Sequence, residues 1–494
     1  MKQDTSNTAK AIRGVSTQSI VTLALGVLDI VIFSFMSHLL SKEDFGYFSA
    51  IMAVTTIFAS FSETGIGSSI IQRKNADDHY VNNAFTMSFL MGAFLMLLLF
   101  CLSGPLSRAV GDVSLKKPLM IMSVTLLCNC LTSINTSLMY KKLQFMRVGV
   151  VQLTTVTVSG IISVVLAALG FGFYAILCQA VLNSVLFFLI SFFAARPKYR
   201  FILVKGTVKE IWSFSGWLMA SVVFRNLAQQ IDNLMMPRLL SMEALGAYNR
   251  PRTLIEKISS KLNSIFDIAL FPILSNIQDD QAAMKRAFEK VLFVMSLVGT
   301  GLFVILFFNA ELIIKIFLGE KWLDLMPMFH VFTFLVIFNI YGRLADCMLR
   351  SLAMTKQQFY FRIAEFITKF PAIFIGVKWG IYGVAVAVVL IDTVMRGVKI
   401  CYIAKKINYP IGGVLVKMAV SNRAFLLIIP FVAALYVFLP HTLGGNIILA
   451  AGSALVFVIV FGCLPSFVGA TYQQDIWAPI KRKILNKIKR QPSC

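Results

Sequence analysis

The sequence predicts an all-α integral membrane protein with about fourteen transmembrane helices. Of its 494 residues, 58% are hydrophobic and only 14% are charged, whereas soluble domains carry about 25% charged residues. Apolar runs of about 20 residues, long enough to cross a bilayer as a helix, recur along the whole chain. Alternating strand patterns are absent, which argues against an outer-membrane barrel.

The candidate spans follow one another with short connections, so we expect no extramembrane domain. Proline-containing pairs such as Gly104-Pro105 and Arg196-Pro197 are expected to end helices, because proline lacks a backbone N–H group. In chain order the spans lie at about 14–37, 45–71, 82–103, 118–139, 148–169, 173–195, 211–236, 251–275, 288–308, 326–349, 358–377, 381–404, 423–439 and 445–468.

The orientation of the spans follows from the distribution of basic residues. Most of the 46 Lys and Arg residues fall in alternate loops, on the same side as both termini. By the positive-inside rule, this places both termini of a multi-pass membrane protein in the cytoplasm. The net charge of +23 is thereby explained without a nucleic-acid partner.

A short internal repeat divides the chain. Leu39-Leu40-Ser41-x-Glu43-x-x-Gly46 recurs as Leu239-Leu240-Ser241-x-Glu243-x-x-Gly246, each time between the first two helices of a six-helix block. We therefore expect two parallel six-helix repeats around a central cavity, with the two motifs close together when the cavity opens to the cytoplasm. The predicted parts are an N-terminal half at 1–205, a C-terminal half at 206–405, an additional helix pair at 406–470 and a basic amphipathic cytoplasmic tail at 471–494.

Residues 211–275 are predicted to form two of the spans, although they are rich in charge. Because a charge that faces lipid costs at least a few kcal/mol, the charged helix faces are expected to line a hydrated cavity. The alternative is a pair of amphipathic helices on the membrane surface, but the number of spans around them requires both to cross. The expected cationic, substrate-binding residues are Arg225, Arg250, Arg252, Lys257 and Lys261.

Carboxylates inside spans are candidates for binding a coupling proton or sodium ion. These candidates are Asp29, Glu63, Asp232 and Asp267, of which the last two are alternatively expected to balance the cationic residues. Other acids have a cation three or four residues away and are expected to pair with it: Asp346 with Arg343, Glu365 with Arg362 and Lys369, and Asp392 with Arg396. The His and Cys residues lack metal-ligand spacing and no glycine-rich phosphate loop is present, so we expect neither a metal nor an organic cofactor.

Several short motifs together resemble one family. They are Glu43-Asp44-Phe45-Gly46, Gly65-Ile66-Gly67, Ile71-Gln72-Arg73-Lys74, Leu143-Gln144-Phe145, Asp232-Asn233-Leu234, Leu245-Gly246-Ala247-Tyr248, Phe271-Pro272-Ile273-Leu274-Ser275 and Gly319-Glu320-Lys321-Trp322. Their order and spacing resemble the Wzx-type polysaccharide-unit flippases, in particular the colanic-acid exporter branch. These flippases belong to the MOP superfamily, with the MATE drug exporters and the lipid II flippase.

The chain departs from the family at two positions. The family often has an acidic residue before the basic one where this chain has Tyr140-Lys141, and it often has Gly in place of Pro237. Because proline lacks an N–H group, Pro237 is expected to end its helix.

The resemblance implies a transporter, not an enzyme. It implies flipping of undecaprenyl-diphosphate-linked oligosaccharide units by alternating access, coupled to a proton or sodium gradient. The implied partners are lipid-linked oligosaccharide, membrane lipids, a polysaccharide polymerase and glycosyltransferases.

Three other functions compete with that of a flippase. A MATE-like exporter of cationic drugs is the main alternative, and its cavity would be dominated by acids. A membrane polymerase or ligase would need a larger external loop than the longest one expected here, at about 309–325. A scaffold gives no reason for charge inside spans.

Overall fold

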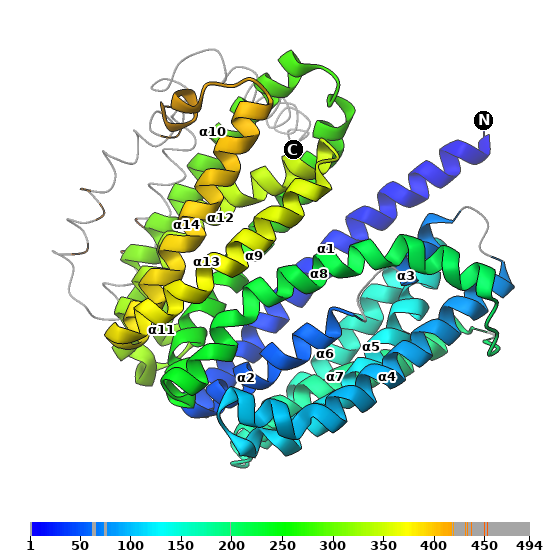
Figure 1. The fold of residues 1–494 in the computed structure, drawn as a ribbon, viewed down its shortest axis with the longest axis horizontal. Helices are drawn as coiled ribbons and strands as arrows, with labels where there is room; N and C mark the ends of the chain where they lie inside the picture. The colour runs from blue at the N-terminus through cyan, green and yellow to red at the C-terminus, as the bar shows by residue number, and fades with distance from the viewer. Residues whose placement is uncertain are drawn as a thin grey trace, which may run out of the picture. The chain divides into compact units, whose positions relative to one another are not determined.

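The computed structural model describes residues 2–61, 66–73, 77–197 and 199–416, with isolated positions beyond (Figure 1). Side chains are described for these residues except at 2–20, 68, 72, 210–221, 261–269, 271–272 and 355. The predicted spans at 423–439 and 445–468, the predicted tail and Glu63 lie outside the described residues.

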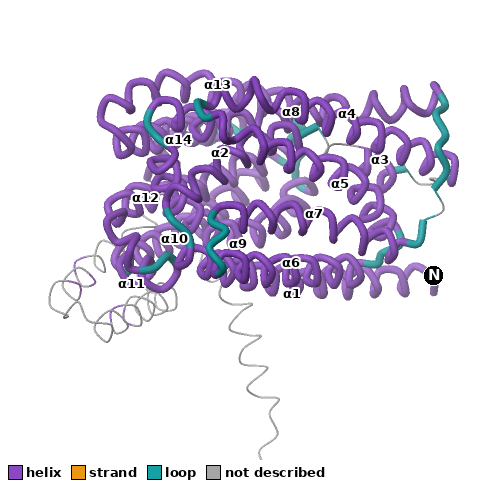
Figure 2. Tube along the Cα trace, turned by 90° about the horizontal axis from the view of Figure 1, so that it is seen from below, coloured by secondary structure: helices purple, strands orange, loops and turns teal. Residues whose placement is uncertain are grey.

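Every regular element among the described residues is a helix (Figure 2). Eight stretches are long and apolar enough to cross a membrane, which confirms the prediction of a helical membrane protein. The α-helices are α1 (Lys2–Leu39), α2 (Lys42–Ala59), α3 (Ile66–Gln72), α4 (Asp78–Val110), α5 (Lys116–Lys141), α6 (Phe145–Ala168), α7 (Phe173–Ala195), α8 (Lys205–Leu239), α9 (Met242–Asn276), α10 (Gln281–Phe308), α11 (Ala310–Phe317), α12 (Met326–Ser351), α13 (Thr355–Gly376) and α14 (Gly380–Lys406). Short 3₁₀ helices are η1 (Val113–Leu115), η2 (Glu320–Leu325) and η3 (Val377–Trp379).

The charged pair of predicted spans corresponds to α8 and α9. Each has 35 residues and is therefore about 50 Å long, more than the roughly 30 Å of a bilayer's hydrocarbon core. Neither helix is among the eight apolar stretches, and in both α8 and α9 some side chains lie outside the described residues.

Two prolines do not end helices as predicted. Helix α4 continues through Pro105 and ends at Gly111, whose φ of 106° is left-handed and favours glycine. Helix α8 continues past Pro237 to Leu239. The predicted span at 45–71 is also divided, into α2 and α3. Helix α7 does end at Ala195, directly before Arg196-Pro197, as expected.

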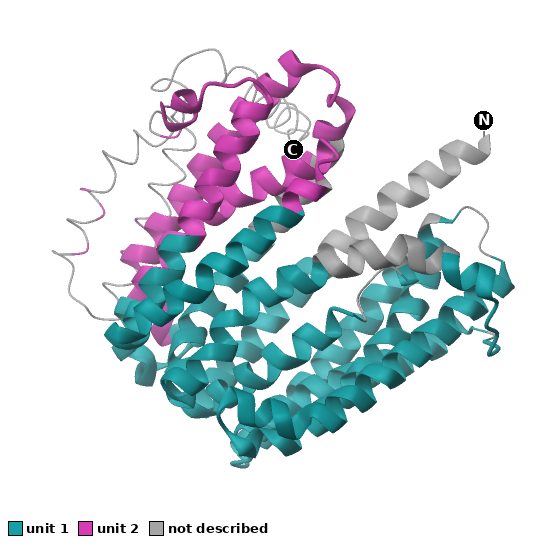
Figure 3. Cartoon of the chain, viewed as in Figure 1, with its two compact units in different colours: residues 1–261, 316–328, 359–391 teal, residues 262–315, 329–358, 392–494 magenta. Residues whose placement is uncertain are grey.

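The chain forms two compact units that interleave along the sequence (Figure 3). Unit 1 comprises residues 1–261, 316–328 and 359–391, and unit 2 comprises 262–315, 329–358 and 392–494. The six-helix halves at 1–205 and 206–405 stay a prediction.

In unit 1, α4 packs on α5, α5 on α7, α7 on α6, and α6 on α1. Small residues bring these helices together, as is usual between membrane helices. A Cβ atom on Gly160 of α6 would lie 2.2 Å from Cδ1 of Ile32 on α1, and one on Gly149 would lie 2.8 Å from both Cγ atoms of Val21. Larger residues at these positions would separate α6 from α1.

Candidate functional site

The two copies of the repeated motif lie side by side in unit 1. Leu39 ends α1 and Leu239 ends α8, and the next helix begins at Lys42 and at Met242. A Cβ atom on Gly46 would lie 1.8 Å from the Met242 carbonyl oxygen, and one on Gly246 would lie 1.7 Å from the Lys42 carbonyl oxygen. The backbones of the two helix starts are therefore in direct contact, which confirms the expected proximity of the motifs.

Arg250 lies next to this contact, enclosed by aromatic rings. Its guanidinium carbon is 3.5 Å from the ring centroid of Phe33 on α1 and 3.6 Å from that of Phe45 on α2. Its Nε donates to Ser37 Oγ at 2.9 Å and its Nη2 to the Phe33 carbonyl at 2.7 Å. Only 8% of the residue is exposed. Arg250 thus joins α9 to α1 and α2, rather than lining an open surface.

Lys257 and Asp29 form an ion pair whose two side chains are both partly exposed. Lys257 Nζ on α9 bonds to Asp29 Oδ2 on α1. The Lys257 side chain is 23% exposed and the Asp29 side chain 46%. Asp29, predicted as a coupling carboxylate without a cation nearby in sequence, therefore has one of the predicted cationic residues as its partner.

Asp232 is held by two groups of α9. Its Oδ2 bonds to Arg252 and accepts a hydrogen bond from Tyr248 Oη at 2.9 Å. Arg252 also donates to Glu256 at 2.9 Å, and Glu256 is 53% exposed. The Asp232 side chain is only 1% exposed and is bonded to Arg252. This agrees with the alternative prediction, in which Asp232 balances the cationic residues.

The remaining predicted residues are described only in part. Arg225 Nε lies 3.4 Å from Asn226 Oδ1, and Asn226 donates to Oγ of Ser60, directly after α2, at 2.7 Å. The side chains of Lys261 and Asp267 lie outside the described residues, as does Glu63. The structure thus brings Asp29, Asp232, Arg250, Arg252 and Lys257 together on α1, α8 and α9.

Two of the pairs predicted within one helix are present. Arg362 bonds to Glu365 at 2.9 Å, and Arg396 to Asp392 at 3.4 Å. Asp346 on α12 has a partner that was not predicted, because Lys399 of α14 bonds to it at 3.0 Å.

Residues from two of the quoted family motifs bind the end of α1 and the start of α2. Asp44 forms a capping box with Ser41 at the start of α2 and also accepts the Phe173 N–H at the start of α7, at 2.8 Å. In η2, Lys321 donates to the carbonyls of His38 and Leu40 at 2.9 and 2.6 Å. These side chains satisfy backbone groups that a helix end leaves without an intrahelical partner.

Trp322 packs beside the residues that enclose Arg250. The tryptophan is fully buried and donates from Nε1 to the Ser37 carbonyl at 3.0 Å, while its ring contacts that of Phe45 at 5.8 Å between centroids. Sequence reasoning missed Phe33, Ser37 and Trp322 as neighbours of Arg250. Phe45 and Trp322 both occur in the quoted motifs, but no spacing rule places them together.

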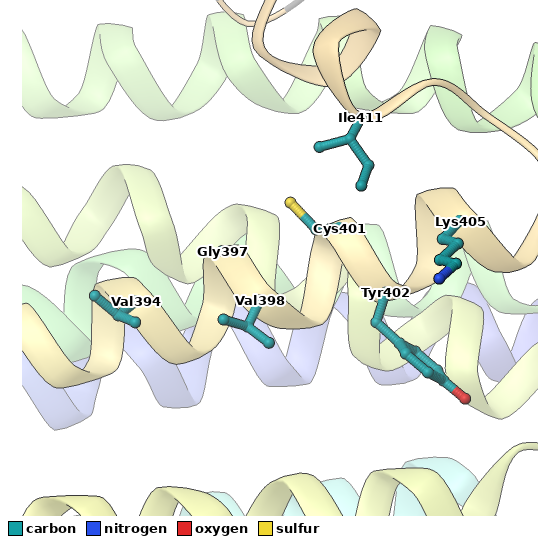
Figure 4. Close-up of a pocket in the computed structure, with 7 residues that line it drawn as sticks. All are labelled: Val394, Gly397, Val398, Cys401, Tyr402, Lys405 and Ile411. Atoms are coloured by element: carbon teal, nitrogen blue, oxygen red, sulfur yellow. The ribbon is translucent and has the colours of Figure 1, made fainter.

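A separate groove of about 510 Å³ lies in unit 2 (Figure 4). None of the predicted site residues described above lines it. It is lined mainly by one side of α14, with Val394, Val398 and Tyr402, and by Ile411. Among the described residues, no group of three or more His, Cys, Asp or Glu side chains is placed to hold a metal ion.

Comparison with known proteins yields one family and several relatives. The family model described as "Polysaccharide biosynthesis protein" matches residues 35–327. The "Lipopolysaccharide biosynthesis protein WzxC" of Escherichia coli (strain K12) is 24% identical over 391 residues, covering 78% of this chain and 79% of the relative.

Two solved structures show the same fold. "Lipid II flippase MurJ, inward closed conformation" gives a TM-score of 0.69 at 17% identity, covering 90% of this chain and 98% of that one. An inward-facing multidrug resistance MATE family transporter of the MOP superfamily gives 0.60 at 14% identity, covering 79% and 98%.

Proposed function

Because the chain belongs to the polysaccharide biosynthesis protein family, we propose that it flips undecaprenyl-diphosphate-linked oligosaccharide repeat units across the bacterial cytoplasmic membrane. The family match over residues 35–327 supports this function, as do the similarity to WzxC and the likeness to the lipid II flippase MurJ. Like these relatives, the protein is a membrane transporter and not an enzyme. The oligosaccharide units would serve the synthesis of a surface polysaccharide.

The proposed architecture has fourteen spans in two parallel six-helix repeats, followed by an additional pair, with both termini in the cytoplasm. The mutual contact of Gly46 with Met242 and of Gly246 with Lys42 supports the repeat. Equivalent positions in two related halves are expected to meet in this way across a symmetry axis. Rocking of the halves about the cavity would open one side of the membrane and then the other.

The observation that carries the proposal is the accessible ion pair of Lys257 with Asp29. A diphosphate carries more negative charge than a carboxylate and offers more acceptor oxygens, so it competes well for a lysine ammonium. In the proposed mechanism, the substrate diphosphate replaces Asp29 on Lys257. The nearby Arg252, bound to the exposed Glu256, would exchange its partner in the same way.

Ion coupling follows from this exchange of partners. Once the diphosphate holds Lys257, Asp29 has lost its bonded cation and is able to take up a proton or a sodium ion. Asp29 is close to half exposed, so an ion can reach it without a rearrangement of the core. Asp232 is buried under Arg252 and Tyr248, which favours Asp29 as the coupling carboxylate.

The proposal is tested with purified protein in liposomes and undecaprenyl-diphosphate carrying a short fluorescent oligosaccharide. Lys257→Glu should lower the flipping rate at least about tenfold, because hydrogen bonds to charged groups contribute about 1.5–3 kcal/mol. Lys117→Glu, an exposed substitution at the start of α5, is the matched control and should flip normally. Collapsing an imposed proton or sodium gradient identifies the coupling ion.

Two results would count against the proposal. Normal flipping by the Lys257→Glu variant would show that Lys257 of α9 does not bind the substrate diphosphate. Export of a cationic dye without any movement of the lipid-linked substrate would favour the MATE-like alternative, which the likeness to the MATE fold supports.

A further inference from the structure

Residues 199–204, called the strap here, join α7 to α8 in unit 1 and run extended across the start of α4. Because the backbone N–H groups of an extended chain alternate in direction, those of every second residue point the same way. The strap uses three such groups: Arg200 N–H donates to Asn82 Oδ1 at 2.9 Å, Ile202 N–H to Thr86 Oγ1 at 3.1 Å and Val204 N–H to Asn83 Oδ1 at 2.6 Å. Positions 82, 83 and 86 share one face of a helix, so α4 presents a row of acceptors to the strap.

The first residue of the strap is anchored in the core. The Tyr199 ring stacks on Phe85 with centroids 3.9 Å apart and planes at 9°. Its hydroxyl donates to Asn135 Oδ1 on α5 at 2.6 Å, and burial raises the pKa of Tyr199, so the hydroxyl stays protonated and keeps donating. The strap is therefore a fixed part of the surface, and the side chains that it exposes are positioned by the fold.

The exposed side of the strap combines apolar and basic side chains. Phe201 is 68% exposed and Leu203 58%. Exposed basic residues surround them: Arg196, Arg200, Lys205 and Lys209. No acidic residue occurs between Arg196 and Lys209 in the sequence. The acids nearest in the sequence of the underlying helix are Asp77 and Asp78, and Asp77 is engaged in capping the Tyr80 N–H.

The length and the polar start of α4 support a strap at the level of the lipid headgroups. The helix has 33 residues and is about 50 Å long, whereas the hydrocarbon core is roughly 30 Å thick. Part of α4 must therefore lie beyond the hydrocarbon, and its start, with Asp78, His79, Asn82 and Asn83, is an end polar enough to do so. A surface that offers aromatic and aliphatic groups together with cations at this depth matches a leaflet containing anionic lipid.

We propose that the strap, with Arg196, Arg200, Lys205 and Lys209, is a binding surface for anionic phospholipid headgroups. Phe201 and Leu203 insert among the upper acyl carbons, and the basic side chains bind the phosphates. Because the hydrogen bonds to Asn82, Asn83 and Thr86 hold the strap against α4, lipid binding fixes α4 and α8 at one depth in the membrane. The inference does not depend on the transported substrate.

Photo-crosslinking tests this inference directly. Phe201 is replaced by p-benzoylphenylalanine, and the full-length protein is placed in nanodiscs with equal amounts of phosphatidylglycerol and phosphatidylcholine. We expect lipid adducts in which phosphatidylglycerol exceeds phosphatidylcholine by at least about tenfold, because each nearby basic residue contributes roughly a fivefold preference for anionic lipid and at least two of the four should act together. In the Arg196→Gln, Arg200→Gln, Lys205→Gln variant, which keeps only Lys209 of the four, the preference should fall several-fold.

The matched control removes three exposed basic residues at the other end of α4 and at the start of α5: Arg108→Gln, Lys116→Gln and Lys117→Gln. This variant should keep the tenfold preference. Absence of lipid adducts at position 201 would overturn the inference, because the strap would then face water or protein. Equal adducts in the parent protein, or an unchanged preference in the neutralised variant, would overturn the role of the basic side chains.

Discussion

Replacing Gly46 with alanine places a methyl carbon where the backbone of the other repeat already lies. The new Cβ atom would be 1.8 Å from the Met242 carbonyl oxygen, whereas carbon and oxygen atoms in contact are about 3.3 Å apart. Because the obstructing atom belongs to the backbone, no side-chain rotation relieves the clash. The starts of α2 and α9 must therefore separate by about 1.5 Å.

Separation of this size has a measurable energetic cost. Forcing an extra methyl group into a packed contact destabilises a protein by about 1–3 kcal/mol, and we expect Gly46→Ala to fall in the upper part of that range. Gly206→Ala is the control, because no atom outside its own helix lies within 4 Å of the position of a Cβ there. Thermal unfolding in detergent should show the difference between the two variants.

Chemical crosslinking should also detect the separation of the starts of α2 and α9. Cysteines at Lys42 and Met242, in a background without native cysteines, should be joined efficiently by a short thiol reagent, and the joined protein should stop flipping lipid. Adding Gly46→Ala should lower the yield of the crosslink several-fold, whereas Gly206→Ala should not. An unchanged yield and unchanged unfolding with Gly46→Ala would refute the close backbone contact, and continued transport by crosslinked protein would refute the rocking mechanism.

Two further predictions concern the enclosed guanidinium and the topology. Arg250→Ala should lower the free energy of unfolding by about 2–4 kcal/mol, because it removes two desolvated cation–π contacts and charged hydrogen bonds. Arg250→Lys should recover only part of this loss; an unfolding temperature unchanged by Arg250→Ala would contradict the structure. Cysteines introduced at Glu43 and Glu243 should be labelled by a membrane-impermeant reagent from outside and those at Lys142 and Lys285 from inside, so outside labelling at Lys285 would exclude fourteen spans.

Interactions within one helix were predictable from the sequence. The pairs Arg362–Glu365 and Asp392–Arg396 follow from the helical repeat alone, because residues three or four apart share a face. The contact between the two repeated motifs followed from their equivalent places in two halves. The ends of α4 and α8 were predicted wrongly, because Pro105 and Pro237 are accommodated within these helices.

Partners from different helices were not predictable from spacing. Nothing in the sequence pairs Asp29 with Lys257, or Asp346 with Lys399, because these contacts depend on how α1 meets α9 and how α12 meets α14. Arg250 was predicted as a site residue from its charge. Its burial was not predictable, because it depends on the rings of Phe33 on α1 and Phe45 on α2.

The binding of η2 to the end of α1 has a consequence for how the protein is made. The carbonyls of His38 and Leu40 are satisfied by Lys321, and Trp322 packs against Phe45. During synthesis, these residues leave the ribosome only after α2 to α11. The carbonyl groups at the end of α1 therefore lack their Lys321 donor until the segment near residue 320 has been synthesised. A fragment released after residue 205 should remain a substrate for membrane quality-control proteases, however well its own helices are inserted.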